Sequence, residues 1–169
     1  MAETGILTED DRVELIEGEI VEMSPIGSRH AACVNRLNML LSRQVGQSAI
    51  VSVQNPIIVN DYSEPEPDLA VLRLRTDYYE QELPQSADVL LVVEVADTSV
   101  EIDRSVKIPL YARNGIPLTI LVDLPKELIE VYSQPANGQY QPVKIFRRGD
   151  SFQLDVSPQL NFNVDDILG

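Results

Sequence analysis

The segment Val89-Leu90-Leu91-Val92-Val93-Glu94-Val95 decides the fold, because all of its side chains except one are apolar. A short, continuous run rich in Val and Leu is typical of a strand that is buried on both faces of a sheet. We therefore predict that it forms the central strand. Its one acid, Glu94, needs an explanation, since a buried carboxylate is costly unless it meets a cation or hydrogen-bond donors.

A helix and another strand are predicted after this central strand. Asp97-Thr98-Ser99 interrupts the apolar run, and we expect a helix from Ile102 to Asn114 that ends at Gly115. The next apolar run, Leu118 to Asp123, follows a proline and predicts a strand.

The rest of the chain adds strands and one more helix around this unit. We predict a hairpin from Val13 to Met23, an amphipathic helix from His30 to Gln44, strands at Ile50 to Val59 and Asp68 to Leu72, and a β-rich tail from Leu128 to Gly169. The order indicates the α/β class, with a mixed central sheet covered by helices in three layers.

The length and composition bound the possible classes of protein. A chain of 169 residues predicts a single domain, with a core at 12–125 and a β-rich extension at 126–169. No run of apolar residues is long enough for a membrane span and the start does not resemble a signal peptide, so we expect a soluble, cytoplasmic protein. Cys33 and His30 are the only cysteine and histidine, which excludes Cys/His zinc sites. Any bound metal must have oxygen ligands, which favours Mg²⁺ or Mn²⁺.

The net charge of −14 counts against a protein that binds nucleic acid over its whole surface. It does not exclude a local basic cleft, because five cations occur in the middle of the chain: Arg73, Arg75, Arg104, Lys107 and Arg113. Bound divalent cations would also offset acids at a site.

Asp68 and Lys107 complete a possible site with Glu94. Asp68 follows Pro65-Glu66-Pro67 and begins an apolar strand, so its carboxylate also needs a partner. Lys107 lies on the predicted helix, where Asp103 and Tyr111 share its face at spacings of four residues. If the helix packs back across the central strand, Lys107 reaches the space in front of Glu94 and Asp68.

Ordinary structural interpretations remain open for each of these residues. An acid at a strand end is often a solvated terminus, and the spacing of Asp103, Lys107 and Tyr111 is often a surface ion pair beside a ring. Glu94 paired with Lys107 could instead be a buried bridge that only supports the fold.

Three further polar residues are candidates from their positions. Glu14 and Glu17 lie in the predicted hairpin, and Glu17-Gly18 is first of all a turn. His30 begins a helix and is the sole imidazole that could titrate near neutral pH. The motifs of nucleophile elbows, phosphate loops and dinucleotide sites are absent from the sequence.

The chain resembles the Uma family of putative restriction endonucleases over roughly residues 12–125. The likeness rests on motifs that follow the family's order: Glu14-Leu15-Ile16-Glu17-Gly18-Glu19-Ile20-Val21-Glu22-Met23, His30, Glu64-Pro65-Glu66-Pro67-Asp68, Val92-Val93-Glu94-Val95, Asp103-Arg104, Lys107, Tyr111-Ala112, Gly115-Ile116-Pro117 and Leu121-Val122-Asp123. Two stretches depart from the pattern: Ala96-Asp97-Thr98-Ser99 stands where a Ser-Pro-Ser-Thr-like turn is usual, and Leu118-Thr119-Ile120 where an acid with aromatics is usual.

The resemblance implies a restriction-endonuclease-like fold and a PD-(D/E)XK nuclease site. The acid pair corresponds to Asp68 and Glu94. We expect the backbone carbonyl of Val95 to be a further metal ligand beside them. The usual lysine position is Ala96 here, and Lys107 on the next helix fits variants in which the lysine has moved. Glu14 corresponds to a third acid near such sites.

The function implied is metal-assisted hydrolysis of DNA phosphodiesters, with Mg²⁺ or Mn²⁺ as cofactor. We expect Asp103 and Tyr111 to hold Lys107, Glu17 and His30 to be supporting residues, and the protein to act as a homodimer, as restriction-type enzymes commonly do. The alternative is a nuclease-fold module that binds DNA or protein without catalysis.

Overall fold

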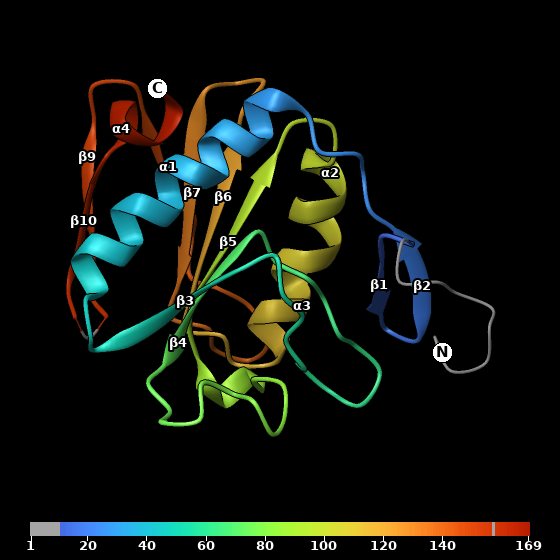
Figure 1. Cartoon of the computed structure of the whole chain (residues 1–169). Coiled ribbons are helices and arrows are strands. Elements are labelled where there is room, and N and C mark those ends of the chain that lie inside the picture. Colours follow the sequence, from blue (N-terminus) through green and yellow to red (C-terminus); the bar gives the residue numbers. More distant parts are fainter. Residues whose placement is uncertain (1–10, 157) are drawn as a thin grey trace.

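A mixed sheet of six strands forms the centre of the structure, a computed structural model that describes residues 11–156 and 158–169. Within this part of the chain the strand order is β3-β4-β5-β6-β7-β8, where only β5 and β6 pair in parallel (Figure 1). The strands are β3 (Ala49–Val53), β4 (Leu69–Arg73), β5 (Val89–Ala96), β6 (Leu118–Asp123), β7 (Leu128–Ser133) and β8 (Lys144–Arg147). The predicted central strand is thus confirmed as β5, which is buried almost throughout.

The parallel pair β5 and β6 requires a crossover, and a helix of three parts provides it. α2 (Val100–Ile102) continues into a π-helical turn (Asp103–Lys107) and then into α3 (Ile108–Arg113). The prediction of a helix here is confirmed, whereas the π turn has no counterpart in the predicted pattern. Pro109 has no N–H to donate, so an α-helical hydrogen bond is lost just where the π turn ends.

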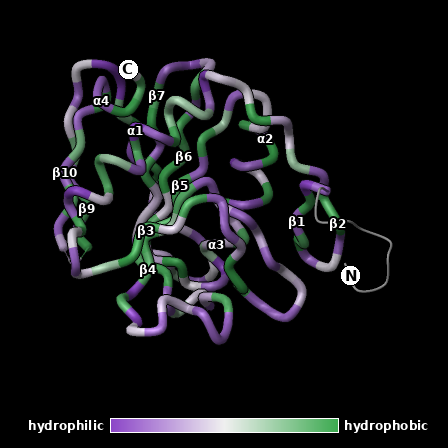
Figure 2. The backbone as a smooth tube through the Cα atoms, viewed as in Figure 1, coloured by the Kyte–Doolittle hydropathy of each residue, from purple (hydrophilic) through white to green (hydrophobic). Residues whose placement is uncertain are grey.

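One face of the sheet is covered by α1 (Ser28–Val45), which ends at Gly46 with a positive φ of 54°. Buried residues of α1 share one hydrophobic cluster with alternate residues of β4 to β7. β9 (Ser151–Leu154), β10 (Leu160–Asn163) and α4 (Val164–Leu168) complete this cluster beside α1. In Figure 2 the hydrophobic segments lie mainly along the central strands, as a core between two layers requires.

The other face of the sheet carries α3 and a second hydrophobic cluster that includes Val92, Leu110 and Tyr111. Because side chains alternate along β5, Val93 and Val95 face α1, whereas Val92 and Glu94 face α2–α3. The strand pattern therefore points Glu94 at the helix that carries Lys107.

The predicted hairpin is confirmed as β1 (Val13–Ile16) and β2 (Glu19–Glu22), with both turn residues at positive φ. It lies apart from the central sheet, on the side of α2–α3 (Figure 1). Backbone hydrogen bonds tie it to the body, from Gly18 N to Tyr62 O (2.8 Å) and from Glu64 N to Leu15 O (2.8 Å). The hairpin is therefore held in place beside the start of β4.

Two sequence predictions need correction. The strand predicted from Ile50 to Val59 ends at Val53, because Gln54 adopts a positive φ of 51° and turns the chain. The tail predicted from Leu128 to Gly169 is β-rich, but β7 and β8 belong to the central sheet and the chain ends in the helix α4, which the sequence pattern did not indicate. In the described part of the chain, no helix has the length and apolar character needed to cross a membrane.

Candidate active site

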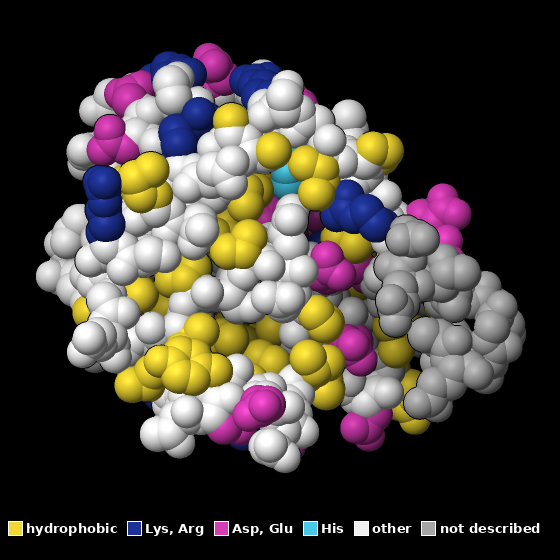
Figure 3. All heavy atoms as spheres, viewed as in Figure 1, with side chains coloured by type: hydrophobic (Ala, Val, Ile, Leu, Met, Phe, Trp, Pro, Cys, Tyr) yellow, Lys and Arg dark blue, Asp and Glu magenta, His cyan; other side chains and the backbone are white. Residues whose placement is uncertain are grey.

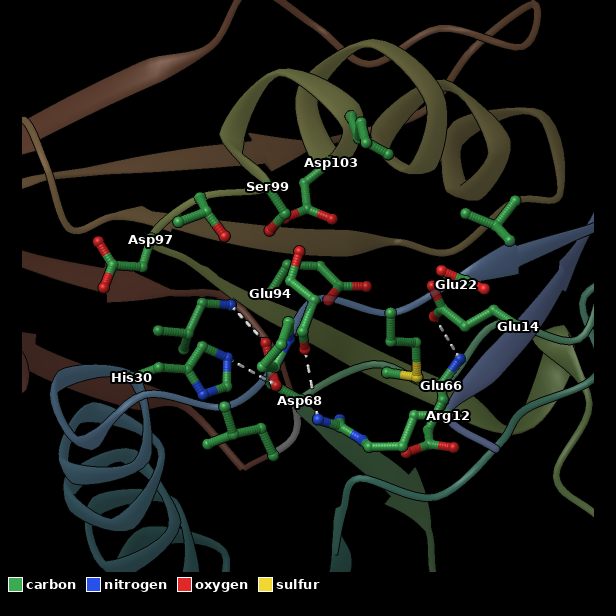
Figure 4. Close-up of a pocket in the computed structure, with 18 of the residues that line it drawn as sticks. Arg12, Glu14, Glu22, His30, Glu66, Asp68, Glu94, Asp97, Ser99 and Asp103 are labelled. Atoms are coloured by element: carbon green, nitrogen blue, oxygen red, sulfur yellow. Dashed lines mark hydrogen bonds and ion pairs between the residues drawn. The ribbon is translucent and has the colours of Figure 1, made fainter. Parts of the chain in front are cut away.

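A cavity of about 190 Å³ lies where the start of β4 and the end of β5 meet the hairpin and the beginnings of α1 and α2. The lining includes seven acidic residues (Figure 4): Glu14, Glu22, Glu66, Asp68, Glu94, Asp97 and Asp103. Lys107, Val95 and His30 line the same cavity. The ends of the interior strands β4 and β5 and the crossover helix thus bring most of the candidate residues to one place.

Asp68 and Glu94 are neighbours across the strands. The antiparallel register pairs Leu69 with Val93, so the residue before Leu69 and the residue after Val93 lie opposite one another on the same face. Asp68 Oδ2 accepts a hydrogen bond from the backbone N–H of Val95 at 2.8 Å. These contacts fix the Asp68 carboxylate at the open end of the β4–β5 pair.

His30 places the first turn of α1 against Asp68. Its Nε2 lies 3.0 Å from Asp68 Oδ1, and this hydrogen bond, together with the negative charge of Asp68, raises the pKa of His30. The other ring nitrogen, Nδ1, is buried without a partner among the described residues. His30 therefore orients an acid of the predicted pair.

Lys107 is buried within a group of three carboxylates. Its Nζ lies 2.7 Å from Glu14 Oε1, 3.3 Å from Glu94 Oε1 and 3.9 Å from Asp103 Oδ1. Burial opposes the charge of Lys107, but the carboxylates of Glu94, Glu14 and Asp103 outweigh it and raise its pKa. Lys107 is therefore an ammonium cation throughout the neutral range.

Burial makes two of the acids around Lys107 harder to ionise. Burial raises the pKa of Glu94 well above its ordinary value, although Lys107 acts in the opposite direction. Burial also raises the pKa of Asp103, whose Oδ2 accepts a hydrogen bond from Ser99 Oγ at 2.7 Å. An added cation would favour the ionised form of both acids.

Tyr111 contacts a different residue from the one expected. Its hydroxyl donates a hydrogen bond to Glu94 Oε1 at 2.6 Å, whereas the expected support of Lys107 comes from Asp103. The π turn lies between the two and changes the spacing of the helix face. Tyr111 thus holds the acid, not the lysine.

Some candidate residues lie outside the cavity lining. Glu17 stands at the hairpin turn, where it forms an ion pair with Arg113. Of the five cations proposed for a basic cleft, only Lys107 lines the cavity. Figure 3 likewise shows Lys and Arg dispersed among acids on this face, without a continuous basic surface.

The sequence interpretation gave no role to several other polar residues of the site, among them Arg12, Ser99 and Glu66. Arg12 and Ser99 line the cavity, and the backbone N–H of Glu66 donates to Glu14 Oε1 at 2.8 Å. Glu66 lies inside the Pro65-Glu66-Pro67-Asp68 motif and Ser99 ends the Ala96-Asp97-Thr98-Ser99 stretch, so their positions could have drawn attention to both. Arg12 has no pattern that distinguishes it.

The donor set suits a hard divalent cation. Among residues 11–156 and 158–169, no three His, Cys, Asp or Glu side chains converge so as to enclose a metal by themselves. Mg²⁺, however, is usually held by one or two carboxylates, with water and substrate phosphate as its other ligands. Asp68 and Glu94 supply such a pair, and Glu94 Oε2 forms no hydrogen bond or ion pair with any described residue.

Comparisons with known proteins identify a family and a shared fold for the chain. A family model, Uma2, described as "Putative restriction endonuclease", matches residues 3–165. The crystal structure of a putative nuclease belonging to DUF820 from Anabaena variabilis ATCC 29413 superposes with a TM-score of 0.74 at 16% sequence identity, covering 98% of this chain and 94% of that one. No curated protein matches the chain. At this identity the structural likeness shows a shared fold.

Proposed function

Because the chain belongs to the Uma2 family of putative restriction endonucleases, we propose that it is a metal-dependent endonuclease that hydrolyses phosphodiester bonds of DNA. One observation carries the proposal: Asp68, Glu94, Lys107 and Glu14, which come from four separate segments of the chain, line one cavity. Such a combination of two cross-strand acids and a lysine suits phosphodiester hydrolysis, in which negative charge develops on the phosphate.

Asp68 and Glu94 would hold Mg²⁺ or Mn²⁺, with the Val95 carbonyl as a further ligand. Bound there, the ion would supply a Lewis acid and lower the pKa of a coordinated water. The contacts of Asp68 with His30 and the Val95 N–H, and of Glu94 with Tyr111, hold both carboxylates in fixed orientations.

Lys107 acts as a fixed positive charge in this proposal. Its raised pKa excludes it as a proton acceptor near neutral pH, so it orients water or stabilises negative charge on the phosphate. Glu14 and Asp103 hold the ammonium group in front of Glu94.

Cleavage of supercoiled and linear DNA with Mg²⁺ or Mn²⁺ tests the proposal. We expect Asp68→Asn and Glu94→Gln to reduce cleavage by at least about a hundredfold, because each removes one anionic metal ligand. Glu80→Gln is the matched control, since Glu80 is exposed in a loop outside the cavity. Thermal melts of all three variants show whether each remains folded.

The alternatives give different results. A nuclease-fold binding module would bind DNA and show no metal-dependent cleavage under any of these conditions. A purely structural Glu94–Lys107 bridge would make Glu94→Gln strongly destabilising, while Mg²⁺ would leave the melting temperature of the wild type unchanged.

A further inference from the structure

Arg12 occupies an unusual position at the acidic cavity. It lies just before β1, and its carbonyl accepts a hydrogen bond from Met23 N at 2.9 Å, which extends the hairpin ladder by one pair. The hairpin is itself tied to the body through Tyr62 and Glu64. The backbone of Arg12 therefore has a defined place at the cavity.

Arg12 is exposed, and its guanidinium has few polar contacts with the described residues. Its one hydrogen bond to a described residue runs from NH1 to Ser24 O at 3.3 Å, and it forms no ion pair within residues 11–156 and 158–169. Lys107, the other Lys or Arg in the described lining, is buried and neutralised by carboxylates. Arg12 is thus the exposed basic side chain of the described cavity wall.

An anionic substrate needs such a group. The cavity wall is rich in carboxylates and the chain carries a net charge of −14, so a phosphodiester entering it would meet repulsion on most sides. A guanidinium presents a planar set of donors that match two phosphate oxygens at once. The charge of Arg12 also reaches the cavity interior: burial raises the pKa of Glu66, and Arg12 opposes this shift.

We infer that Arg12 binds a backbone phosphate of the DNA and so seats the scissile strand over Asp68 and Glu94. This assignment rests on the proposed nuclease function and adds to it the residue that recognises the substrate backbone. Contact with a phosphate carries no base information, so Arg12 contributes affinity and position without selecting a sequence.

The salt dependence of DNA binding measures such a contact directly. Each phosphate that a protein neutralises contributes about −0.9 to the slope of log K against log salt for duplex DNA and about −0.7 for single strands. We would measure fluorescence anisotropy of labelled duplex and single-stranded DNA over a series of NaCl concentrations, with Ca²⁺ present. The proteins are wild type, Arg12→Gln, Arg12→Lys and Arg43→Gln.

Arg43→Gln is the matched control because Arg43 is also exposed and lies about 20 Å along α1 from His30. We expect Arg12→Gln to weaken binding about tenfold and reduce the slope by about one phosphate contact. Arg12→Lys should keep the slope and bind less tightly than wild type, since it retains the charge but loses the planar donors. Arg43→Gln should match wild type.

Cleavage kinetics separate this inference from the proposed function. Arg12→Gln should raise KM about tenfold with little change in kcat, as expected when binding is lost equally from substrate and transition state. If wild type cleaves DNA and Arg12→Gln has the same salt slope and KM as Arg43→Gln, the role of Arg12 is wrong and the nuclease proposal stands. If wild type neither binds nor cleaves DNA, both fail.

Discussion

Lys107 is the residue at which the proposed metal site and the buried ion network meet. Its ammonium group lies 3.3 Å from Glu94 Oε1, so it already neutralises part of the charge that a metal ion would use. Two cations that share one carboxylate repel each other, and the repulsion is strong where water is largely excluded. In the proposed mechanism, the lysine would therefore lower the affinity of the site for metal while it serves the reaction.

Replacing Lys107 should consequently have opposite effects on two properties. We predict that Lys107→Met binds Mn²⁺ or Mg²⁺ about tenfold more tightly than wild type, a coupling of about 1.4 kcal/mol, and that its cleavage activity is lost. Isothermal titration calorimetry measures the affinity. Lys126→Met is the control, because Lys126 is 64% exposed and lies outside the cavity. Weaker metal binding by Lys107→Met would show that the lysine supports the ion instead of competing with it.

Cys33 offers a test of the core that does not depend on activity. Its side chain is fully buried on the face of α1 that packs against the sheet, and burial raises the pKa of the thiol to about 11. At about pH 8 only about one thiol in a thousand would be thiolate, the reactive form. We predict that a disulfide reagent such as DTNB labels Cys33 in denaturant but not in the native protein. Fast native labelling would mean that α1 opens from the sheet readily.

At the scale of elements, Arg104 connects the π turn to the central sheet. Its guanidinium donates to both oxygens of Glu130, at 3.2 and 2.7 Å, and to Asp123 Oδ2 at 3.1 Å. The acceptor side chains are 8% and 1% exposed. Arg104 thus holds the segment that carries Lys107 against β6 and β7.

Removing this cation would take the guanidinium from two buried carboxylates. Among the described residues, these would keep only the hydrogen bonds from Lys126 N to Asp123 and from Tyr132 to Glu130 and the longer contact of Lys126 Nζ with Asp123. We predict that Arg104→Met lowers the free energy of unfolding by about 3 kcal/mol, measured by urea denaturation. The triple variant Arg104→Met, Asp123→Asn, Glu130→Gln should recover most of this loss, because neither buried side chain then carries a charge that has lost its guanidinium counterion. Arg113→Met, in the same helix, is the control: its pair with Glu17 is about half exposed and is worth less than about 1 kcal/mol. Equal losses from Arg104→Met and Arg113→Met would contradict the prediction.

The sequence predicted a helix or strand correctly where its pattern of apolar residues follows directly from burial against the sheet. The apolar run of β5 and the three- and four-residue spacing of α1 are both consequences of burial on a sheet, so they identify their elements correctly. The segment after β3 shows where the pattern misleads. Ile57 and Val59 are β-branched and buried, but they lie in a loop because Gln54 turns the chain and Pro65 O, not a neighbouring strand, accepts from Ile57 N.

For the candidate site too, the sequence predicted some features and missed others. The order of the family motifs was enough to predict that Asp68, Glu94, Lys107 and Glu14 lie together, and the structure does bring them to one cavity. The bond from Tyr111 to Glu94 depends on the π turn, which no spacing rule indicated. The position of Arg12 depends on where the hairpin docks, a long-range contact that leaves no local signal.

At the scale of the whole molecule, the net negative charge and the number of active sites per chain affect how the protein would cut a DNA duplex. One cavity with one pair of cross-strand acids would act on one strand at a time. Two strands of a duplex run in opposite directions, so a twofold pair of identical subunits presents equivalent sites to both. A pair of subunits would also supply two Arg12 contacts against the repulsion of the negative surface.

We therefore predict that the active form on duplex DNA is a homodimer. Analytical ultracentrifugation should give a dimer mass at concentrations at which linear double-strand products form. Mixing wild type with an excess of Asp68→Asn should convert these products into nicked circles, because each mixed dimer would hold one competent metal site. A monomer that makes double-strand breaks in direct proportion to its concentration, with no nicking in the mixture, would exclude the dimer. It would imply that one cavity cuts the two strands in turn, and that the affinity for duplex DNA comes from a single chain.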